Sequence, residues 1–149
     1  MNTGAIVEVS NRNNTIEVQT FKCWMFNGVL ITCVRLFDGS VWQPWEWVNP
    51  PMELGVEYRT TERYEGKPVY VRLINFGALP NASKKTIAAP DNLKTSISYD
   101  IISTTGALLT GYDAISSFAC SDGVIAIKTV VDESNTNVHV RLAYTKTTD

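Results

Sequence analysis

The chain has 149 residues, of which 44% are hydrophobic and 19% are charged, and its formal net charge is −2 at pH 7. This length and composition suit an ordinary globular protein, and the small net charge excludes a general attraction to nucleic acid or to an anionic membrane. The sequence has no apolar run of about 18 residues and no basic-then-apolar N-terminus, so we expect neither membrane insertion nor a signal peptide.

The first third of the chain shows short runs of alternating apolar and polar residues, the pattern of β-strands. Four strands are predicted there, over residues 4–9, 15–21, 29–37 and 41–48. Residues 11–14 and the pair Asp38-Gly39 are typical of hairpin turns, the second being a two-residue signal. These features predict a small antiparallel unit, the knob, over residues 1–48.

The same pattern resumes after Asn49-Pro50-Pro51. Further strands are predicted over residues 57–64, 67–76, 84–89, 95–103, 107–110, 115–120, 124–131 and 138–146. In the last of these, Val138, Val140, Leu142 and Tyr144 point to one face and residues 139, 141, 143 and 145 to the other, which we expect to face water or a partner. The pattern predicts a second all-β domain over residues 49–149, a β-sandwich or jelly-roll-like head.

The strands around Glu65-Gly66 form a predicted hairpin. With these two residues as the turn, Arg59 would face Arg72, an unfavourable pair unless a carboxylate lies between the two side chains. Glu57 or an acid from another copy of the chain is expected to supply it.

This hairpin is also unusually charged and aromatic, because it carries Tyr58, Arg59, Arg63 and Tyr64. Three interpretations stay open at this point. The first is a solvated edge hairpin that its charges protect from aggregation. The second is a subunit interface, and the third is a ligand-binding surface.

No catalytic or metal-binding constellation occurs in the sequence. There is one histidine, His139, and no nucleophile elbow, P-loop or zinc-protease motif. The three cysteines lack a Cys-x-x-Cys spacing, so we expect free thiols, with a Cys23–Cys33 disulfide as the open alternative. We therefore predict a protein that is not an enzyme and uses no cofactor or metal.

Carbohydrate binding is compatible with the loops, because aromatic rings stack on sugars while Asp and Asn side chains hydrogen-bond to sugar hydroxyls. The candidate ligand-binding residues are Tyr112 with Asp113, Asp91 with Asn92, and Asn135 with Asn137.

The segment "VWQPWEWVNPPM", residues 41–52, holds three of the four tryptophans and three of the six prolines. Alternation along a strand would place Trp45 and Trp47 on one face and Trp42 on the other, so the three indoles would not form one platform. Because the prolines stiffen the chain, we interpret this segment as a rigid seam between knob and head. We place Tyr58, Arg59, Arg63 and Tyr64 at the same seam or at a subunit interface.

A longer block, "SVWQPWEWVNPPMELGVEYRTTERYEGKPVYVRLINFGALPN" at residues 40–81, resembles receptor-binding tail-fibre proteins of bacteriophages and prophages. The ending "LAYTKTTD" resembles the terminal strand of the same group, and "IEVQTF" with "VRLFDGSVWQPW" is less specifically similar to its knob unit. Residues 82–141 match only in type. The specific likeness therefore covers residues 40–81 and the last eight residues.

This resemblance implies a homotrimeric fibre tip on the virion, made in the bacterial cytoplasm and forming the end of a longer fibre. The head would adsorb to host surface polysaccharide, teichoic acid or lipopolysaccharide, and the knob would join the fibre shaft or other tail proteins. The alternative is a structural trimerisation module, with the receptor bound by another protein. The resemblance transfers no catalytic residues.

Overall fold

The computed structural model describes residues 4–12, 16–24 and 30–149. Within these ranges the chain forms β-strands and no helix, which confirms the predicted all-β class. The strands are β1 (Ala5–Arg12), β2 (Ile16–Trp24), β3 (Leu30–Phe37), β4 (Glu46–Trp47), β5 (Glu57–Tyr64), β6 (Lys67–Ala78), β7 (Lys84–Ala88), β8 (Leu93–Ser103), β9 (Ile115–Ser121), β10 (Val124–Thr129) and β11 (Asn137–Lys146). No helix among the described residues is long and apolar enough to cross a membrane.

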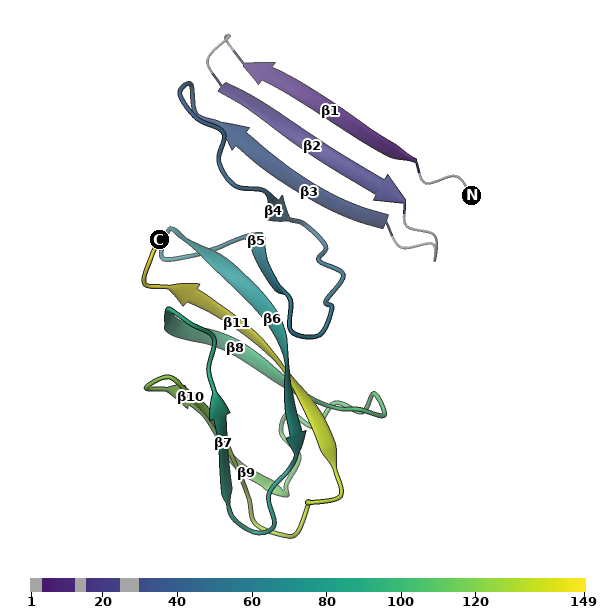
Figure 1. Ribbon diagram of the computed structural model, residues 1–149, viewed down its shortest axis with the longest axis vertical. Helices are drawn as coiled ribbons and strands as arrows, with labels where there is room; N and C mark the ends of the chain where they lie inside the picture. The colour runs from purple at the N-terminus through teal and green to yellow at the C-terminus, as the bar shows by residue number, and fades with distance from the viewer. Residues whose placement is uncertain (1–3, 13–15, 25–29) are drawn as a thin grey trace.

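The strands form two lobes joined at a narrow waist (Figure 1). One sheet runs through both lobes in the order β1-β2-β3-β4-β5-β6-β11-β8, and a second sheet has the order β7-β10-β9. Every pairing between strands is antiparallel except that of β4 with β5, where Trp47 pairs with Thr60. The head, β5 to β11, is a two-layer sandwich, while the division into residues 1–48 and 49–149 stays a prediction.

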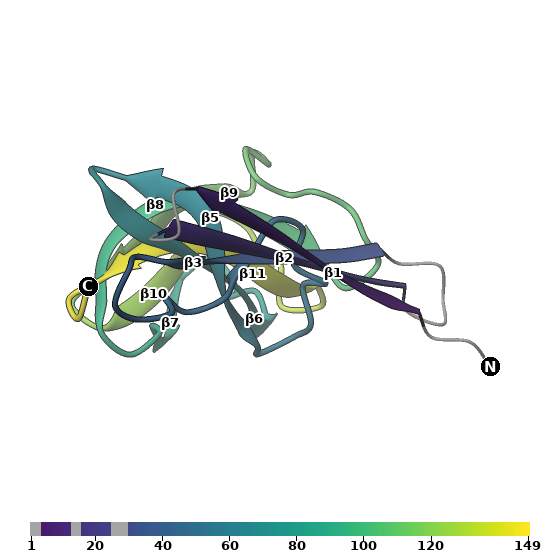
Figure 2. The ribbon, with the colours of Figure 1, turned by 90° about the horizontal axis from the view of Figure 1, so that it is seen from above.

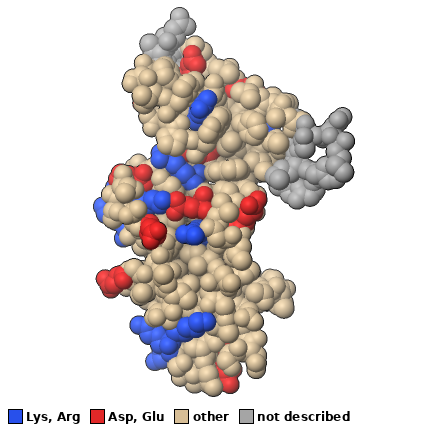
Figure 3. Space-filling model, viewed as in Figure 1, with Lys and Arg blue, Asp and Glu red and all other residues tan. Residues whose placement is uncertain are grey.

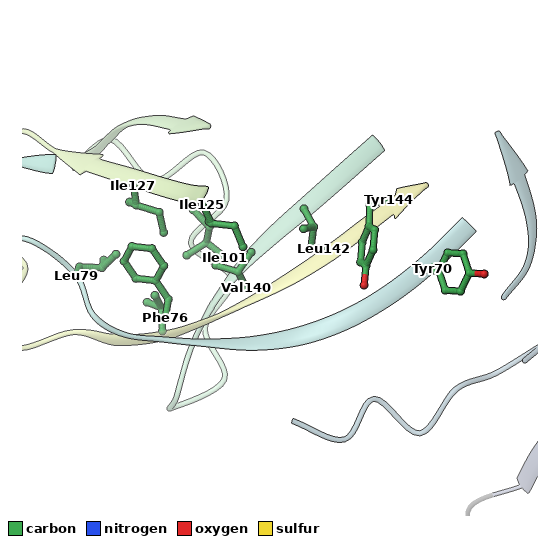
Figure 4. Packing of buried hydrophobic residues seen from close by; sticks show 10 residues of the cluster. Tyr70, Phe76, Leu79, Ile101, Ile125, Ile127, Val140, Leu142 and Tyr144 are labelled. Atoms are coloured by element: carbon green, nitrogen blue, oxygen red, sulfur yellow. The ribbon is translucent and has the colours of Figure 1, made fainter. Parts of the chain in front are cut away.

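The core of the head lies between its two layers, and β11 crosses its centre. Val138, Val140, Leu142 and Tyr144 are all fully buried, which confirms the predicted inward face of this strand. Figure 4 shows Val140, Leu142 and Tyr144 in a row with side chains from β6, β8 and β10. The opposite face is not all open, because Ala143 is buried in a second cluster with residues of β6.

Strands β1 to β3, named the knob sheet here, form a single thin layer (Figure 2). Ile6, Val7 and Val9 are 43%, 57% and 56% exposed. Because neighbouring residues of a strand point to opposite faces, both faces of the sheet carry exposed apolar side chains. Neither cluster of buried hydrophobic residues in the described chain includes a residue of the knob sheet.

The predicted strand at residues 41–48 is wrong. Only β4 and an isolated bridge between Phe37 and Trp42 form there, because the chain turns over four residues and then meets Pro44, which cannot donate to a ladder. The turn is held by Asp38, whose carboxylate accepts hydrogen bonds from the backbone N–H groups of Ser40 and Val41 at 3.0 Å. The two-residue hairpin at Asp38-Gly39 is therefore also wrong.

Two further expectations need correction. The strand at residues 107–110 is absent, since only Leu108 forms a bridge, with Ile102. In the turn expected at residues 11–14, Asn11 and Arg12 belong to β1, and the remaining residues lie outside the described part of the chain.

The β5–β6 hairpin turns at Glu65 and Gly66 as predicted, with positive φ at both. A register shift between Arg59 and Arg63 places Arg59 opposite Tyr70. The predicted pairing of Arg59 with Arg72 is therefore wrong, because the irregularity shifts the register and Arg72 pairs with Glu57 instead.

The cysteines are free thiols. Cys23 pairs with Ile31, and Cys33 pairs with Phe21, so the two cysteines of the knob sheet do not face each other across the strands.

A core substitution tests the packing of β11. We expect Leu142→Ala to lower the free energy of unfolding by about 2–5 kcal/mol, because the side chain is fully buried between the layers. Urea unfolding measures the change. The matched control, Leu108→Ala at a side chain that is 65% exposed, should change it by about 0.5 kcal/mol or less. Equal losses in both variants would contradict the assigned core.

Candidate functional site

Two of the three predicted ligand pairs meet at the end of the head farthest from the knob sheet (Figure 1). The Tyr112 hydroxyl donates a hydrogen bond to Glu133 at 3.3 Å, and the Thr136 hydroxyl donates to the other oxygen of Glu133 at 3.0 Å. These contacts bring the loop of Tyr112 and Asp113 beside the loop of Asn135 and Asn137. All four predicted residues are exposed. We name these two segments, residues 104–114 and 130–137, the distal loops.

The distal loops also expose apolar side chains. Leu108, Tyr112, Val130 and Val131 are 65%, 45%, 56% and 50% exposed. The backbone N–H of Val130 donates to the carbonyl of Ala114 at 3.0 Å, so the apolar residues come from two joined segments. An exposed aromatic ring beside apolar and carboxylate groups is a surface on which a sugar ring can stack and hydrogen-bond.

The third predicted pair, Asp91 and Asn92, lies at the opposite end of the strands. Both residues line a cavity of 350 Å³, and a neighbouring cavity of 260 Å³ shares Gly55 and Arg72 with it. We name the combined depression the polar groove. Its polar lining is Glu57, Arg72, Asn75, Asp91, Asn92 and Lys146. The structure therefore separates this pair from the other two and adds charged partners from β5, β6 and β11.

Hydrogen bonds fix the charged side chains of the polar groove. The Glu57 carboxylate accepts hydrogen bonds from the Tyr144 hydroxyl and from the Lys146 ammonium group. Arg72 donates from Nε to the carbonyl of Gly55 at 2.9 Å. Burial, followed by the hydrogen bond to Glu57 and the charge of Glu57, raises the pKa of Tyr144 far above its usual range. Tyr144 therefore stays a donor to Glu57 from beneath the groove. The lining residues Asp91, Asn92 and Lys146 supply donors and acceptors together, which suits recognition of hydroxyl groups.

The tryptophan-rich segment is arranged differently from the prediction. The Arg35 guanidinium lies 4.4 Å from the centre of the Trp42 ring and 4.6 Å from that of Trp45, so these two indoles share one cation. Trp47 packs edge-on against Tyr58, with ring centres 5.2 Å apart. The predicted common face of Trp45 and Trp47 is confirmed, because Trp47 pairs with Cys33, Cys33 pairs with Phe21, and Phe21 contacts Trp45. The predicted opposite face for Trp42 is wrong, because residues 42–45 do not form a continuous strand and Trp42 shares Arg35 with Trp45.

Glu46 is the residue at the waist that sequence reasoning missed. Its carboxylate accepts from Arg59 at 3.0 Å and from Arg63 at 2.7 Å, and its side chain is only 12% exposed. Burial alone would lower the pKa of Arg59, but the hydrogen bond to Glu46, together with Tyr70 and the Glu46 charge, outweighs it and raises that pKa. The sequence did contain a hint of this contact, because Glu46 is the one acid in the tryptophan-rich segment and the following hairpin carries several arginines.

The two other residues assigned to the seam lie in the same hairpin as Arg59 and Arg63. Tyr58 is buried, and its hydroxyl accepts a hydrogen bond from the backbone N–H of Glu53 at 3.3 Å. Tyr64 is 38% exposed and pairs with Lys67 beside the turn. Among the described residues, no group of three or more His, Cys, Asp and Glu side chains is placed to hold a metal ion.

No protein-family model matches the chain, and no curated protein matches it either. The chain is similar to the N-truncated R2-type pyocin tail fiber, with a TM-score of 0.38, 11% identity, and coverage of 94% of this chain and 81% of that chain. It is also similar to a C-terminal part of the R1 pyocin fiber of P. aeruginosa, with a TM-score of 0.30, 10% identity, and coverage of 93% and 56%. Both similarities are too weak to carry an argument about function.

Removing the Glu46 charge tests the waist. We expect Glu46→Gln to lower the free energy of unfolding by roughly 1–3 kcal/mol, because two partly buried guanidinium groups lose their shared carboxylate. Thermal and urea unfolding measure the loss. The control Glu62→Gln removes the same charge from an exposed position of the same hairpin and should be nearly neutral. A neutral Glu46→Gln would contradict the assigned role.

The Tyr144 hydroxyl predicts a loss of stability at alkaline pH. Its folded pKa is raised above the usual value of about 10, so the unfolded chain releases the proton first as the pH rises. The contribution of the protonated Tyr144 hydroxyl to the free energy of unfolding is complete below about pH 10 and is lost as the pH rises above this value. Urea unfolding at about pH 8 and about pH 11 should show a smaller alkaline loss in Tyr144→Phe than in the wild type. The control Tyr112→Phe, at an exposed ring, should lose as much unfolding free energy between the two pH values as the wild type does. An equal loss in Tyr144→Phe would contradict the role of the Tyr144 hydroxyl.

Proposed function

We propose that this protein is the tip of a bacteriophage or prophage tail fibre, which adsorbs to a glycan on the surface of the host without catalysing a reaction. The observation that carries the proposal is the knob sheet, a single layer with exposed apolar side chains on both faces. An isolated sheet of this kind is marginally stable in water, so it needs further protein surface to cover it. The resemblance of residues 40–81 to tail-fibre proteins points to a fibre as the source of that surface.

The covering surface in this proposal is two further copies of the chain. Three copies around a threefold axis would bury the apolar faces of the knob sheets against one another and would protect their edge strands. The knob would then lead into the fibre shaft or other tail proteins. This arrangement places the head at the outer end of the fibre, which is the end that meets the host.

The glycan would contact the head at the distal loops, the polar groove or both. The distal loops supply the Tyr112 ring with the carboxylates of Asp113 and Glu133, and the polar groove supplies Asp91 and Asn92. Surface polysaccharide, teichoic acid and lipopolysaccharide all present the hydroxyl groups that such donors and acceptors recognise.

One observation favours the alternative function, a structural trimerisation module whose receptor is bound by another protein. No aromatic side chain belongs to the lining of the polar groove among the described residues. Sugar sites commonly use an aromatic ring as a stacking surface. Of the two proposed glycan sites, the distal loops are the one that supplies an exposed ring beside loop carboxylates, so the receptor proposal depends most on Tyr112.

Cell adsorption tests the proposal. The purified protein should bind intact host cells and lose binding to cells stripped of surface polysaccharide. Tyr112→Ala should weaken adsorption about tenfold, as expected for a ring at the centre of a contact, while Ser98→Ala, at an exposed position in the middle of β8, should leave adsorption unchanged. Equal binding to intact and stripped cells, or a well-formed oligomer that binds neither, would contradict the proposal. Host polysaccharide incubated with the protein should keep its chain length and acetyl content, and shortening would contradict the non-catalytic assignment.

A further inference from the structure

The small sheet β7-β10-β9 turns one face to the core of the head and the other to the solvent. Ile87, Ile125 and Ile127 point inward and belong to or pack against the core cluster. Because neighbouring residues of a strand point to opposite faces, Lys84 on β7 and Lys128 on β10 point outward, and both are exposed. Figure 3 shows a patch of Lys and Arg side chains on the lower lobe, at the place where Figure 1 shows β7.

Lys84 and Lys128, named the lysine pair here, are direct partners in the antiparallel pairing of β7 with β10. Direct partners have Cβ atoms about 4.5–5.5 Å apart, and like charges at this distance destabilise a sheet. Within the described residues, neither ammonium group lies within ion-pair distance of an acid or donates a hydrogen bond. The pair is therefore a local excess of positive charge in a chain that has 15 acids and 13 Lys and Arg residues.

The other lysine of β7 has a structural role that the lysine pair lacks. Lys85 pairs with Ile127 and points inward, where its ammonium group donates to the carbonyl oxygens of Phe76 and Ala78 at 3.1 and 2.6 Å. Its donors are used within the chain. The ammonium groups of the lysine pair have no such acceptors among the described residues, so their counter-charge comes from the solvent or from a ligand.

Hydroxyl groups and small side chains surround the lysine pair. Ser117 of β9 pairs with Lys128 on its other side, so two ammonium groups and one hydroxyl form a row across the three strands. The next row on the same face holds Thr86, Ala126 and Ala119. None of these neighbours is longer than threonine, so an extended polymer can lie on the face without obstruction. The ammonium groups can bind phosphate or carboxylate oxygens, and the hydroxyls can hydrogen-bond beside them.

The lysine pair also adjoins the distal loops. The backbone N–H of Thr129 donates to the carbonyl of Ser83 at 3.0 Å, so the residues next to the two lysines are joined. The backbone N–H of Ala82 donates to the carbonyl of Val131, within the distal loops, at 3.0 Å. A polymer that contacts this part of the distal loops can therefore continue onto the lysine pair.

We propose that the lysine pair binds the anionic groups of an acidic cell-surface glycan. This inference rests on the proposed adsorption function and narrows its ligand to charged polymers. The shared chemistry is a carboxylate or phosphate repeated along a chain that bears hydroxyl groups. A uronic-acid polysaccharide and a polyol-phosphate polymer are the two sources that the experiment separates.

Isothermal titration calorimetry of the purified full chain with defined polymers tests the proposal. Polygalacturonate represents the carboxylate source, poly(glycerol phosphate) represents the phosphate source, and dextran is the neutral control. We expect at least one acidic polymer to bind with a Kd below about 1 mM at low salt. Because the contact is exposed, its affinity should fall when the salt concentration is raised to about 0.3 M. Dextran should show no binding that depends on the lysine pair.

Matched variants assign the site. Lys84→Gln and Lys128→Gln should each weaken binding of the acidic polymer about twofold to fivefold, and the double variant about tenfold, since exposed charge contacts are lost. Lys84→Arg keeps the positive charge and should bind at least as tightly as the wild type. The control Lys94→Gln removes one positive charge from an exposed position on β8 and should bind like the wild type.

Thermal unfolding separates a binding role from a structural one. Because the two like charges repel each other, Lys84→Gln and Lys128→Gln should unfold at the same temperature as the wild type or at a higher one. Loss of polymer binding in a variant of unchanged or raised stability would support the site. Lowered stability in both variants, with binding of the folded protein unchanged, would overturn it.

The two proposals fail in different ways. If adsorption depends on surface polysaccharide but neither acidic polymer binds, the lysine pair is not an anion site and the fibre-tip proposal stands. If an acidic polymer binds through the pair but adsorption is the same on stripped cells, the pair binds anions, and its assignment to a cell-surface glycan is wrong together with the fibre-tip proposal. Equal loss of binding in Lys84→Gln and Lys94→Gln would indicate general charge attraction and would also overturn the site.

Discussion

The Glu46 carboxylate lies between the guanidinium groups of Arg59 and Arg63, and the relative placement of the two lobes depends on this contact. The backbone link at the waist is small, because β4 has two residues and pairs with β5 through one residue pair. Trp47 against Tyr58 adds an aromatic contact beside the charges. Without this carboxylate, the guanidinium groups of Arg59 and Arg63 would lie near each other at the waist without the acid that they share.

The two lobes bury their apolar side chains to different extents. The head buries β11 between two layers, and its core side chains reach zero exposure. The knob sheet has no second layer among the described residues and leaves Val7 and Val9 more than half exposed. Since apolar burial is the main favourable term in folding, a well-buried head beside a partly uncovered sheet supports the proposal that assembly completes the fold.

Alternation predicted most of the fold because strand pattern is local. The inward face of β11 and the turn at Glu65-Gly66 were readable from neighbouring residues alone. The bulge in β5 was not, because it lies between Arg59 and Arg63, whose shared partner Glu46 comes from another strand. The same applies to Trp42, whose position follows from a four-residue turn and from Arg35, and not from alternation.

The candidate sites were predictable in residue type and not in grouping. Asp91 and Asn92 were recognisable as polar loop residues, but Glu57 and Lys146 join them from distant positions in the sequence. Tyr112 was recognisable as a loop aromatic, whereas its contact with Glu133 requires two loops to fold against each other. Contacts of this kind depend on which distant strands and loops lie side by side. The local pattern of residues does not show this.

The central claim is that copies of this chain cover one another's knob sheets. Sedimentation equilibrium of the purified protein measures its mass in solution most directly. The account predicts a single species of about 50 kDa, three chains of 16.5 kDa, that persists on dilution. A stable monomer of 16.5 kDa at every concentration would contradict it.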